Sequence, residues 1–255
     1  MNISTLSYIK LHLEALTYTE KEFGKSHINY RKLLFQLGNL YRHISQYEKA
    51  LQTLLNLKEN IQKSIGISNN EYRMCLNSLA ISYRANGDYE KALRILLDLK
   101  ESIEDKIGNQ NSDYGICLGN LANLYLTIGQ YQKSVDLNIQ ALEITKNING
   151  KDDSYYGFCL NNLALSYQAM GQYEKAMPLM IESFKIAKKN KGKEHSLYAM
   201  RLGNLALMGS LLNASKEALP MFLESIEVAK KVLGKEHPFY ATLLSNLSLL
   251  YINIG

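Results

Sequence analysis

The chain has 255 residues, of which 46% are hydrophobic and 21% are charged, so it can form a packed core and is not a disordered segment. Its formal net charge is +5, with 29 Lys and Arg against 24 Asp and Glu. That excess is too small at this length to indicate a nucleic-acid or membrane surface. Three Cys are too few for a disulfide framework, and neither a signal peptide nor a bilayer-spanning apolar run is recognisable. These features predict a cytoplasmic protein.

The sequence repeats itself with a period of 42 residues. Four positions keep their residue type at this step over five or six cycles. They are a leucine (Leu37, Leu79, Leu121, Leu163, Leu205, Leu247), a first tyrosine (Tyr30, Tyr72, Tyr114, Tyr156, Tyr198, Tyr240), a second tyrosine (Tyr41, Tyr83, Tyr125, Tyr167, Tyr251) and a glycine (Gly24, Gly66, Gly108, Gly150, Gly192, Gly234). This regularity predicts a protein built from stacked repeats.

In chain order, the sequence predicts an unpaired helix, five two-helix units and a final unpaired helix. Within a unit, apolar residues from Tyr72 to Tyr83 have the spacing of one helix face, and the pattern restarts at Tyr89 after a turn at Gly87. We call these helices A and B. The expected ranges are 1–24 for a leading B helix (helical from about 4 to 23), 27–66, 69–108, 111–150, 153–192 and 195–234 for the A/B units, and 237–255 for a last A helix.

No alternating strand pattern is present, so the predicted fold class is all-α. A helix pair cannot bury both of its apolar faces alone, and neighbouring units must therefore stack. We expect a single solenoid domain over residues 1–255, at least three-quarters helical, with eleven or twelve long helices.

The turn before each helix A holds a residue that can cap a helix N-terminus. Asn69, Asn111 and Asp153 are common capping residues, and His27, His195 and His237 occupy the same repeat position. We therefore interpret these histidines as capping or turn residues. The glycine after each helix B suits a left-handed residue at the end of a helix.

The motif formed by Leu79, Ala80 and Tyr83 in helix A, followed by Gly87, Tyr89 and Ala92, resembles the tetratricopeptide repeat. The 42-residue period exceeds the usual 34 and resembles the kinesin-light-chain type, as do the segments Asn162-Leu163-Ala164 and Gly234-Lys235-Glu236-His237-Pro238. The resemblance covers nearly the whole chain. It implies a right-handed α-α superhelix that binds other proteins. Members of the family share no catalytic chemistry, so the resemblance implies no reaction.

In tetratricopeptide proteins helix A lines the concave face, which implies where a partner would bind this chain. The candidate binding residues are asparagines and arginines at corresponding positions of successive A helices. They are Asn39, Arg42, Asn77, Arg84, Asn120, Asn123, Asn161, Asn162, Asn204 and Asn246. A ladder of amides can pair with the backbone of an extended peptide, and two arginines can hold a carboxylate. The alternative is that these asparagines bridge adjacent helices. Later positions such as Phe158, Leu165, Met200 and Leu207 turn this face apolar.

No catalytic residue, metal site or cofactor site is expected. Cys75, Cys117 and Cys159 are one repeat apart, which keeps them too far from one another for a disulfide or a shared zinc ion and indicates buried packing residues. Nucleophile, zinc-binding helix and phosphate-loop motifs are absent. The sequence thus favours a non-enzymatic scaffold that binds a peptide or partner protein.

Two other functions stay open. The chain could be the regulatory or sensor module of a larger enzyme, for example a caspase-like CHAT protease or a histidine kinase, because such arrays precede effector domains in proteins that it resembles. A nucleic-acid-binding solenoid is disfavoured, since most lysines lie at the ends of B helices and in turns rather than along one stripe with aromatics.

Two regions depart from the repeat. In the fifth unit Gly209 replaces the helix A tyrosine, Asn213 the turn glycine and Ser215 the first residue of helix B, which indicates either a decayed repeat or a joint where the solenoid flexes or a partner inserts. The last helix, 237–255, is apolar on the side that a B helix would cover. We expect that side to be covered by a longer native protein, by another molecule or, most simply, by self-association.

Overall fold

The computed structural model describes residues 3–254, and side-chain exposure from Ser7 to Ile254. This part of the chain forms twelve helices and no strand, which confirms the all-α prediction. The helices are α1 (Ile3–Phe23), α2 (Ile28–His43), α3 (Tyr47–Ser64), α4 (Asn70–Asn86), α5 (Tyr89–Ile107), α6 (Ser112–Thr127), α7 (Tyr131–Asn149), α8 (Ser154–Ala169), α9 (Tyr173–Lys191), α10 (Ser196–Leu211), α11 (Ser215–Val232) and α12 (Pro238–Ile254).

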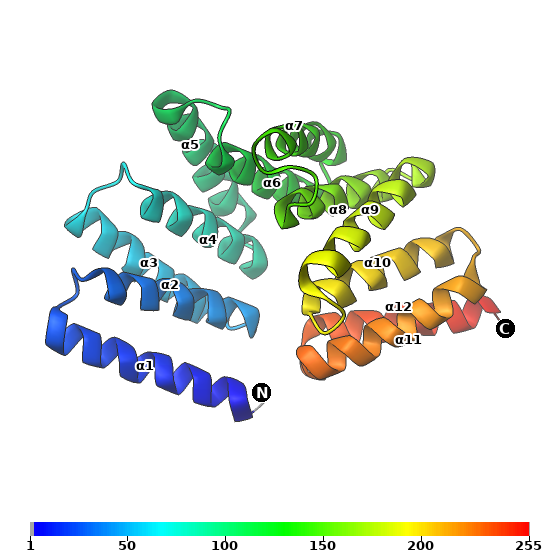
Figure 1. Cartoon of the computed structure of the whole chain (residues 1–255), viewed down its shortest axis with the longest axis horizontal. Coiled ribbons are helices and arrows are strands. Elements are labelled where there is room, and N and C mark those ends of the chain that lie inside the picture. Colours follow the sequence, from blue (N-terminus) through cyan, green and yellow to red (C-terminus); the bar gives the residue numbers. More distant parts are fainter. Residues whose placement is uncertain (1–2, 255) are drawn as a thin grey trace. The chain divides into compact units, whose positions relative to one another are not determined.

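The helices group into two compact units, Met1–Asn109 with α1 to α5 and Gln110–Gly255 with α6 to α12. Within each unit, helices that follow one another in the chain pack side by side, and alternate helices also touch, as α2 touches α4 and α6 touches α8 (Figure 1). The even-numbered helices are the A helices and the odd-numbered ones the B helices. That the two units form one continuous domain stays a prediction.

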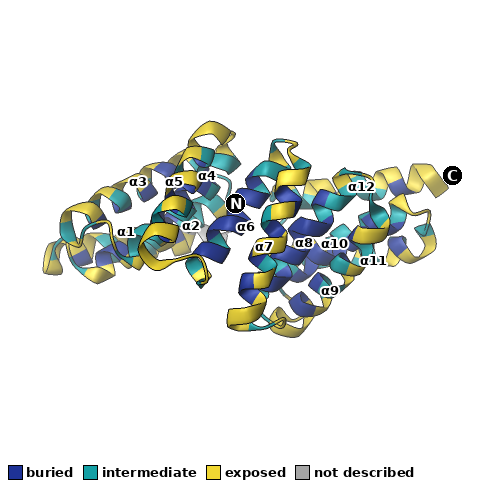
Figure 2. Ribbon diagram, turned by 90° about the horizontal axis from the view of Figure 1, so that it is seen from above, coloured by how far each residue is buried: buried dark blue, intermediate teal, exposed yellow. Residues whose placement is uncertain are grey.

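Helices A and B of a unit approach closely because one position of helix A carries a very small side chain. Ala80, Ala122, Ala164 and Ala206 occupy this position, each at most 1% exposed. In the first unit it is Gly38, where a Cβ atom would lie 2.7 Å from Cγ of Leu54 on the facing helix. Figure 2 shows the result in α8 and α10, where buried residues run along most of each helix.

The tight turns between helices A and B need a residue in the left-handed region. Gly87 supplies it with φ of 89°, whereas Ser45 and Asn213 hold the same turn position with φ of 60°. The backbone bond that closes the turn is preserved in all three, for instance from Ala214 N–H to the Gly209 carbonyl at 2.8 Å. The fifth unit therefore keeps the backbone turn of the repeat despite its altered sequence.

The predicted N-caps of the A helices are confirmed at all six positions. The side chains of Asn69 and Asn111 accept hydrogen bonds from backbone N–H groups three residues on, both at 2.9 Å, and Asp153 accepts two such bonds. The three histidines accept through Nδ1 from the N–H group two residues on; at His237 the donor is Phe239 and the distance is 3.1 Å. A neutral imidazole can make this bond and a protonated one cannot, because its Nδ1 carries a hydrogen.

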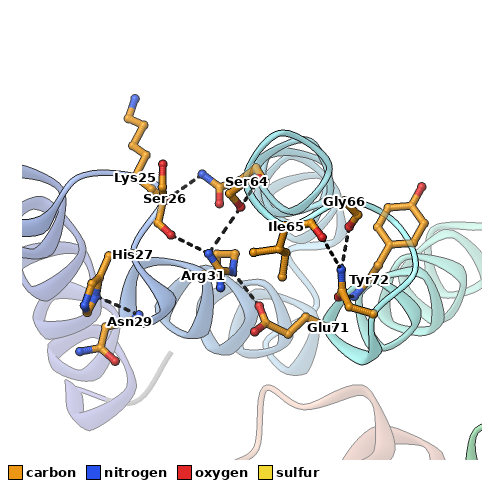
Figure 3. Close-up of polar contacts among 12 residues, drawn as sticks. Lys25, Ser26, His27, Asn29, Arg31, Ser64, Ile65, Gly66, Glu71 and Tyr72 are labelled. Atoms are coloured by element: carbon orange, nitrogen blue, oxygen red, sulfur yellow. Dashed lines mark hydrogen bonds and ion pairs between the residues drawn. The ribbon is translucent and has the colours of Figure 1, made fainter.

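Arg31 forms a buried polar network that ties α2 to α3 and α4 (Figure 3). Its Nε donates to the Glu71 carboxylate at 2.7 Å, and Nη1 donates to the Ser26 carbonyl at 2.6 Å and to the Ser64 hydroxyl at 3.4 Å. The Arg31 side chain is 6% exposed and that of Glu71 is 36% exposed. Removal of Glu71 would leave a desolvated guanidinium without a carboxylate, which is strongly unfavourable.

Acidification should weaken the cap of α12. Burial lowers the pKa of His237 below its ordinary 6.5, so the unfolded chain binds this proton more tightly than the folded chain does. The free energy of unfolding should therefore be unaffected by this group above about pH 7 and fall as the pH drops through 6.5 to below the folded pKa. Denaturant titrations at pH 7.5 and 5.5 should show that His237→Asn removes part of this loss. The control variant His12→Asn changes a histidine inside α1 that caps no helix, so it should keep the full loss of unfolding free energy between pH 7.5 and 5.5. An equal loss in the wild type and in His237→Asn would contradict the role of His237.

Replacement of Glu71 by Ala should lower the free energy of unfolding by about 2 kcal/mol, less than for a fully buried pair because Glu71 is partly solvated. The double variant Arg31→Leu, Glu71→Ala should regain part of that loss, since it leaves no unpaired charge. Glu59→Ala is the matched control. Its ion pair with Lys63 is exposed on both sides, so a change of less than about 0.5 kcal/mol is expected. Equal effects of Glu71→Ala and Glu59→Ala in denaturant titrations would refute the proposed role of the buried network.

Candidate functional site

The A helices of the second compact unit (Gln110–Gly255) share a stripe of half-buried or exposed side chains at corresponding positions, which we call the A-helix stripe. On α10 it consists of Met200, Asn204, Leu207 and Leu211, spaced i, i+4, i+7 and i+11, so the four side chains share one face. Met200 is 38% exposed and Leu211 is 43% exposed, and the other two stripe residues, Asn204 and Leu207, are half-buried. The same positions on the other helices hold Ile116, Asn123 and Thr127 on α6, Phe158, Leu165 and Ala169 on α8, and Thr242, Asn246, Leu249 and Asn253 on α12.

The asparagines singled out in the sequence divide into accessible and buried groups. Asn39, Asn77, Asn123, Asn204 and Asn246 are half-buried, with part of each side chain facing solvent. Asn120 is 8% exposed, and Asn161 and Asn162 are each 3% exposed. Their burial makes direct contact with a partner depend on local opening, so of the candidate amides only the half-buried ones are open to direct contact. That any of them binds a partner stays a prediction.

The buried asparagines serve helix packing. Asn161 on α8 accepts a hydrogen bond at Oδ1 from Nδ2 of Asn204 on α10, at 2.9 Å. This bond joins two A helices and orients the Asn204 amide within the A-helix stripe. The Nδ2 group of Asn162 is buried without a hydrogen-bond partner, which is costly and leaves a donor for a water molecule or a ligand atom.

Two arginines lie close together in the first compact unit (Met1–Asn109). Arg42 and Arg84 stand near the C-terminal ends of α2 and α4, at the same repeat position. Burial lowers the pKa of each guanidinium, and the charge of Arg84 lowers the pKa of Arg42 further. Arg42 donates from Nη2 to Asn39 Oδ1 at 3.0 Å, while its buried Nε has no hydrogen-bond partner. An anion placed beside Arg42 would offset this repulsion and pair with the free donor.

Lysines stacked on tyrosines form a repeated feature that the sequence reasoning missed. In four units the Lys Nζ near the start of helix B lies 5.3 to 5.7 Å from the ring centre of the second tyrosine of helix A. The pairs are Tyr41 with Lys49, Tyr83 with Lys91, Tyr125 with Lys133 and Tyr167 with Lys175. The constant spacing of eight residues from the tyrosine to the lysine could have predicted these pairs from the sequence. The fifth unit has Gly209 and Glu217 instead, so it lacks this clamp across the turn.

The cysteine position of helix A is a packing position, as predicted. Cys75, Cys117 and Cys159 form no disulfide and are 0% exposed, and burial raises the pKa of Cys75 and of Cys159 to about 12. Such thiols are neither nucleophiles nor metal ligands at neutral pH. In the fifth unit the same position is Arg201, 5% exposed, with its pKa lowered to about 10 by burial. Alignment of the repeats by their period would have found this buried charge.

Tyr155 of α8 crosses to α6 and requires a glycine there. Its hydroxyl donates to the Ile116 carbonyl at 3.0 Å, and a Cβ atom on Gly119 would lie 2.2 Å from that hydroxyl oxygen. The ring also stacks on Phe158 of the A-helix stripe, with ring centres 5.3 Å apart. Tyr155 thereby fixes the position of one stripe residue.

Across residues 3–254 no group of three or more His, Cys, Asp or Glu could hold a metal ion. None of the twelve helices combines the length and apolarity that a membrane span requires.

Comparison with known proteins identifies the family. The tetratricopeptide repeat model matches residues 71–147 and 158–231, more than half of the chain. The chain therefore belongs to the tetratricopeptide repeat family, as its sequence motifs suggested. A model described as anaphase-promoting complex subunit 5 matches residues 8–64, and no curated protein sequence matches the chain.

Several solved structures share the fold. Kinesin light chain TPR-like repeats from Podosopora anserina superpose with a TM-score of 0.58 at 21% identity, covering 80% of this chain and 97% of theirs. NprR in complex with its cognate peptide NprX gives a TM-score of 0.71 at 19% identity, covering 95% of this chain and 67% of that one. A Rap protein complexed with competence and sporulation factor gives 0.67 at 14% identity, covering 98% and 71%. These likenesses show an α-helical repeat solenoid.

Gly119→Ala should lower the free energy of unfolding by about 1 to 2 kcal/mol, because the new methyl group displaces the Tyr155 hydroxyl from its carbonyl partner. The higher helix propensity of Ala offsets only part of this loss. Gly115→Ala in the same helix is the control, since its Cβ would lie 3.3 Å from a side-chain methyl carbon of Ile144 and should be tolerated. Denaturant titration checks both variants, and equal stabilities would contradict the packing role of Tyr155.

Proposed function

We propose that this chain is a non-enzymatic interaction scaffold that binds an extended peptide segment, or such a segment of a partner protein, on its A helices. The observation that carries the proposal is the A-helix stripe of α10. There the half-buried Asn204 lies between the apolar side chains of Met200 and Leu207. Its amide can pair with a peptide backbone while the flanking side chains bury apolar groups of the ligand.

The structural neighbours support this function. NprR in complex with its cognate peptide NprX, and a Rap protein complexed with competence and sporulation factor, share the fold of this chain. Their identity to this chain is below 25%, so they support binding of a peptide or factor by this fold and do not identify the ligand or the residues that contact it. The hydrogen bond between Asn161 and Asn204 adds a physical argument, because a preoriented amide loses less entropy when a ligand binds.

In the first compact unit, Arg42 of α2 and Arg84 of α4 suit an anionic group. A carboxylate is the group most expected in a polypeptide, either as an acidic side chain or as a C-terminus. The buried Nε of Arg42 has no hydrogen-bond partner, and a carboxylate could accept from it after a local opening. We therefore infer that peptides with an acidic residue bind this unit more tightly than neutral peptides do.

A second candidate function is regulation of an enzyme whose catalytic domain lies outside this chain. It uses the same surface, since a sensor also binds a ligand on its A helices. The fifth unit favours it, because the buried Arg201 and the missing clamp at Gly209 weaken that unit relative to its neighbours. Hydrogen exchange of the 255-residue chain would show faster exchange in α10 and α11 than in α8 and α9 if this unit is the flexible one.

Met200→Glu should weaken binding of peptides selected from a random displayed library by tenfold or more, about 1.4 kcal/mol, because it places a charge in the A-helix stripe. Ile181→Glu on α9 is the matched control. Ile181 is 37% exposed against 38% for Met200 but lies on a B helix, so affinity should be unchanged. Affinities by fluorescence anisotropy decide. If Ile181→Glu weakens binding and Met200→Glu does not, the site lies on the B helices.

Arg42→Gln should reduce the preference for acidic peptides while leaving neutral peptides unaffected. The comparison is the ratio of affinities for an Asp-containing peptide and its Asn analogue, measured at low and high salt. The ratio should fall several-fold in the variant, and its salt dependence should shrink. A ratio that does not change would exclude Arg42 from carboxylate recognition.

A further inference from the structure

The buried Arg201 of α10 has no counter-ion. It is 5% exposed, and among residues 3–254 its guanidinium makes neither an ion pair nor a hydrogen bond. Burial lowers its pKa to about 10, so it stays protonated at neutral pH. The nearby Cys159 thiol does not balance this charge, because burial raises the pKa of that thiol to about 12. A desolvated guanidinium without an acceptor is costly, and a bound anion would remove that cost.

Arg201 lines a narrow cavity between α8, α9 and α10, together with Ser154, Ser183 and Leu197. The Ser154 hydroxyl accepts a hydrogen bond from Asn190 Nδ2 at 3.3 Å, so its own hydrogen can be donated to an anion. Ser154 is the first residue of α8 and Leu197 is the second residue of α10. Two helix N-termini therefore adjoin the cavity, and their dipoles add to the positive potential of the arginine.

The first compact unit shows what the corresponding place holds when the charge is balanced. There Arg31 donates to the Glu71 carboxylate at 2.7 Å (Figure 3). Gly157 follows Arg31 by three periods of 42 residues, and it lines the same cavity as Arg201. Leu197 follows Glu71 by the same interval, so an apolar side chain stands where the carboxylate would be. The cavity beside Arg201 is thus the counterpart of a buried ion pair whose carboxylate is missing.

The carboxylates in the loops before α8 and α10 have other partners. Asp152 and Glu194 each pair with a lysine, and Asp153 accepts two backbone hydrogen bonds at the start of α8. The cavity is too narrow in this structure to hold a water molecule, so a ligand enters only if the half-buried Leu197 side chain moves aside. This limit favours one small planar group, and a carboxylate can pair with a guanidinium through two parallel hydrogen bonds.

We propose that Arg201 anchors an anion site that binds a small carboxylate ion between α8, α9 and α10. The Ser154 hydroxyl is the second donor, and Leu197 is the side chain that moves aside. A bound carboxylate stabilises the fifth repeat unit, which consists of α10 and α11, because it neutralises the buried charge there. The site does not use the side chains of the A-helix stripe, so it is independent of the proposed peptide binding.

Thermal unfolding of the 255-residue chain in sodium acetate and in sodium chloride of equal concentration tests the site. For a dissociation constant of about 10 mM, about 100 mM acetate should raise the Tm by about 2 to 4 °C above its value in chloride. Salts also act on stability without binding, and Arg201→Cys measures that part, because Cys is the residue at this position in three other repeats. A rise in Tm as large in Arg201→Cys as in the wild type would overturn the proposal.

Two substitutions of Leu197 test the site while Arg201 stays in place. Leu197→Glu puts a carboxylate at the repeat position of Glu71, so the Tm in chloride should rise and the additional rise in acetate should vanish. Leu197→Gln is the neutral match and should keep the acetate response. An acetate response in Leu197→Glu as large as in Leu197→Gln would place the anion elsewhere and contradict the proposal. Peptide affinity of both variants should match that of the wild type, which separates this site from the peptide site.

Discussion

The structure depends on the close approach of packed helices at positions with very small side chains. At Gly38 the facing Leu54 occupies the space of a missing Cβ, and at Gly119 the Tyr155 hydroxyl does the same between two A helices. Because dispersion forces need contact distances, this approach allows short helices to bury most of their surface. It also leaves little room for function on α8 and α10, where most residues are buried.

That constraint explains how polar residues divide between structure and function. Asparagines that face a neighbouring A helix, such as Asn161, are buried and bond across the interface. Asn123, three residues along α6 from the buried Asn120, stays half-buried and partly accessible. The buried arginines follow the same logic. Arg31 is paired with Glu71, while Arg201 occupies the position that a cysteine holds in three other repeats and is 5% exposed.

Much of the fold could be predicted because its determinants are local and repeated. Helix periodicity, the caps at Asn69 or His237 and the burial of Cys117 depend on nearby residues and recur at a fixed step. Long-range partners could not be predicted in this way. The bond between Arg31 and Glu71 depends on how three helices meet. Asn162 is buried whereas Asn204 and Asn246 at the same repeat position are half-buried, so its burial depends on the neighbouring helices and not on its place in the repeat.

The central claim is that ligands bind on the A helices and not on the outer B helices. Photo-cross-linking tests it most directly, with benzoylphenylalanine placed at Met200 in one variant and at Ile181 in another. These two positions have nearly equal exposure, so background labelling is matched. A peptide that binds the chain should cross-link at position 200 and not at position 181. Cross-linking at 181 alone would contradict this account of the site.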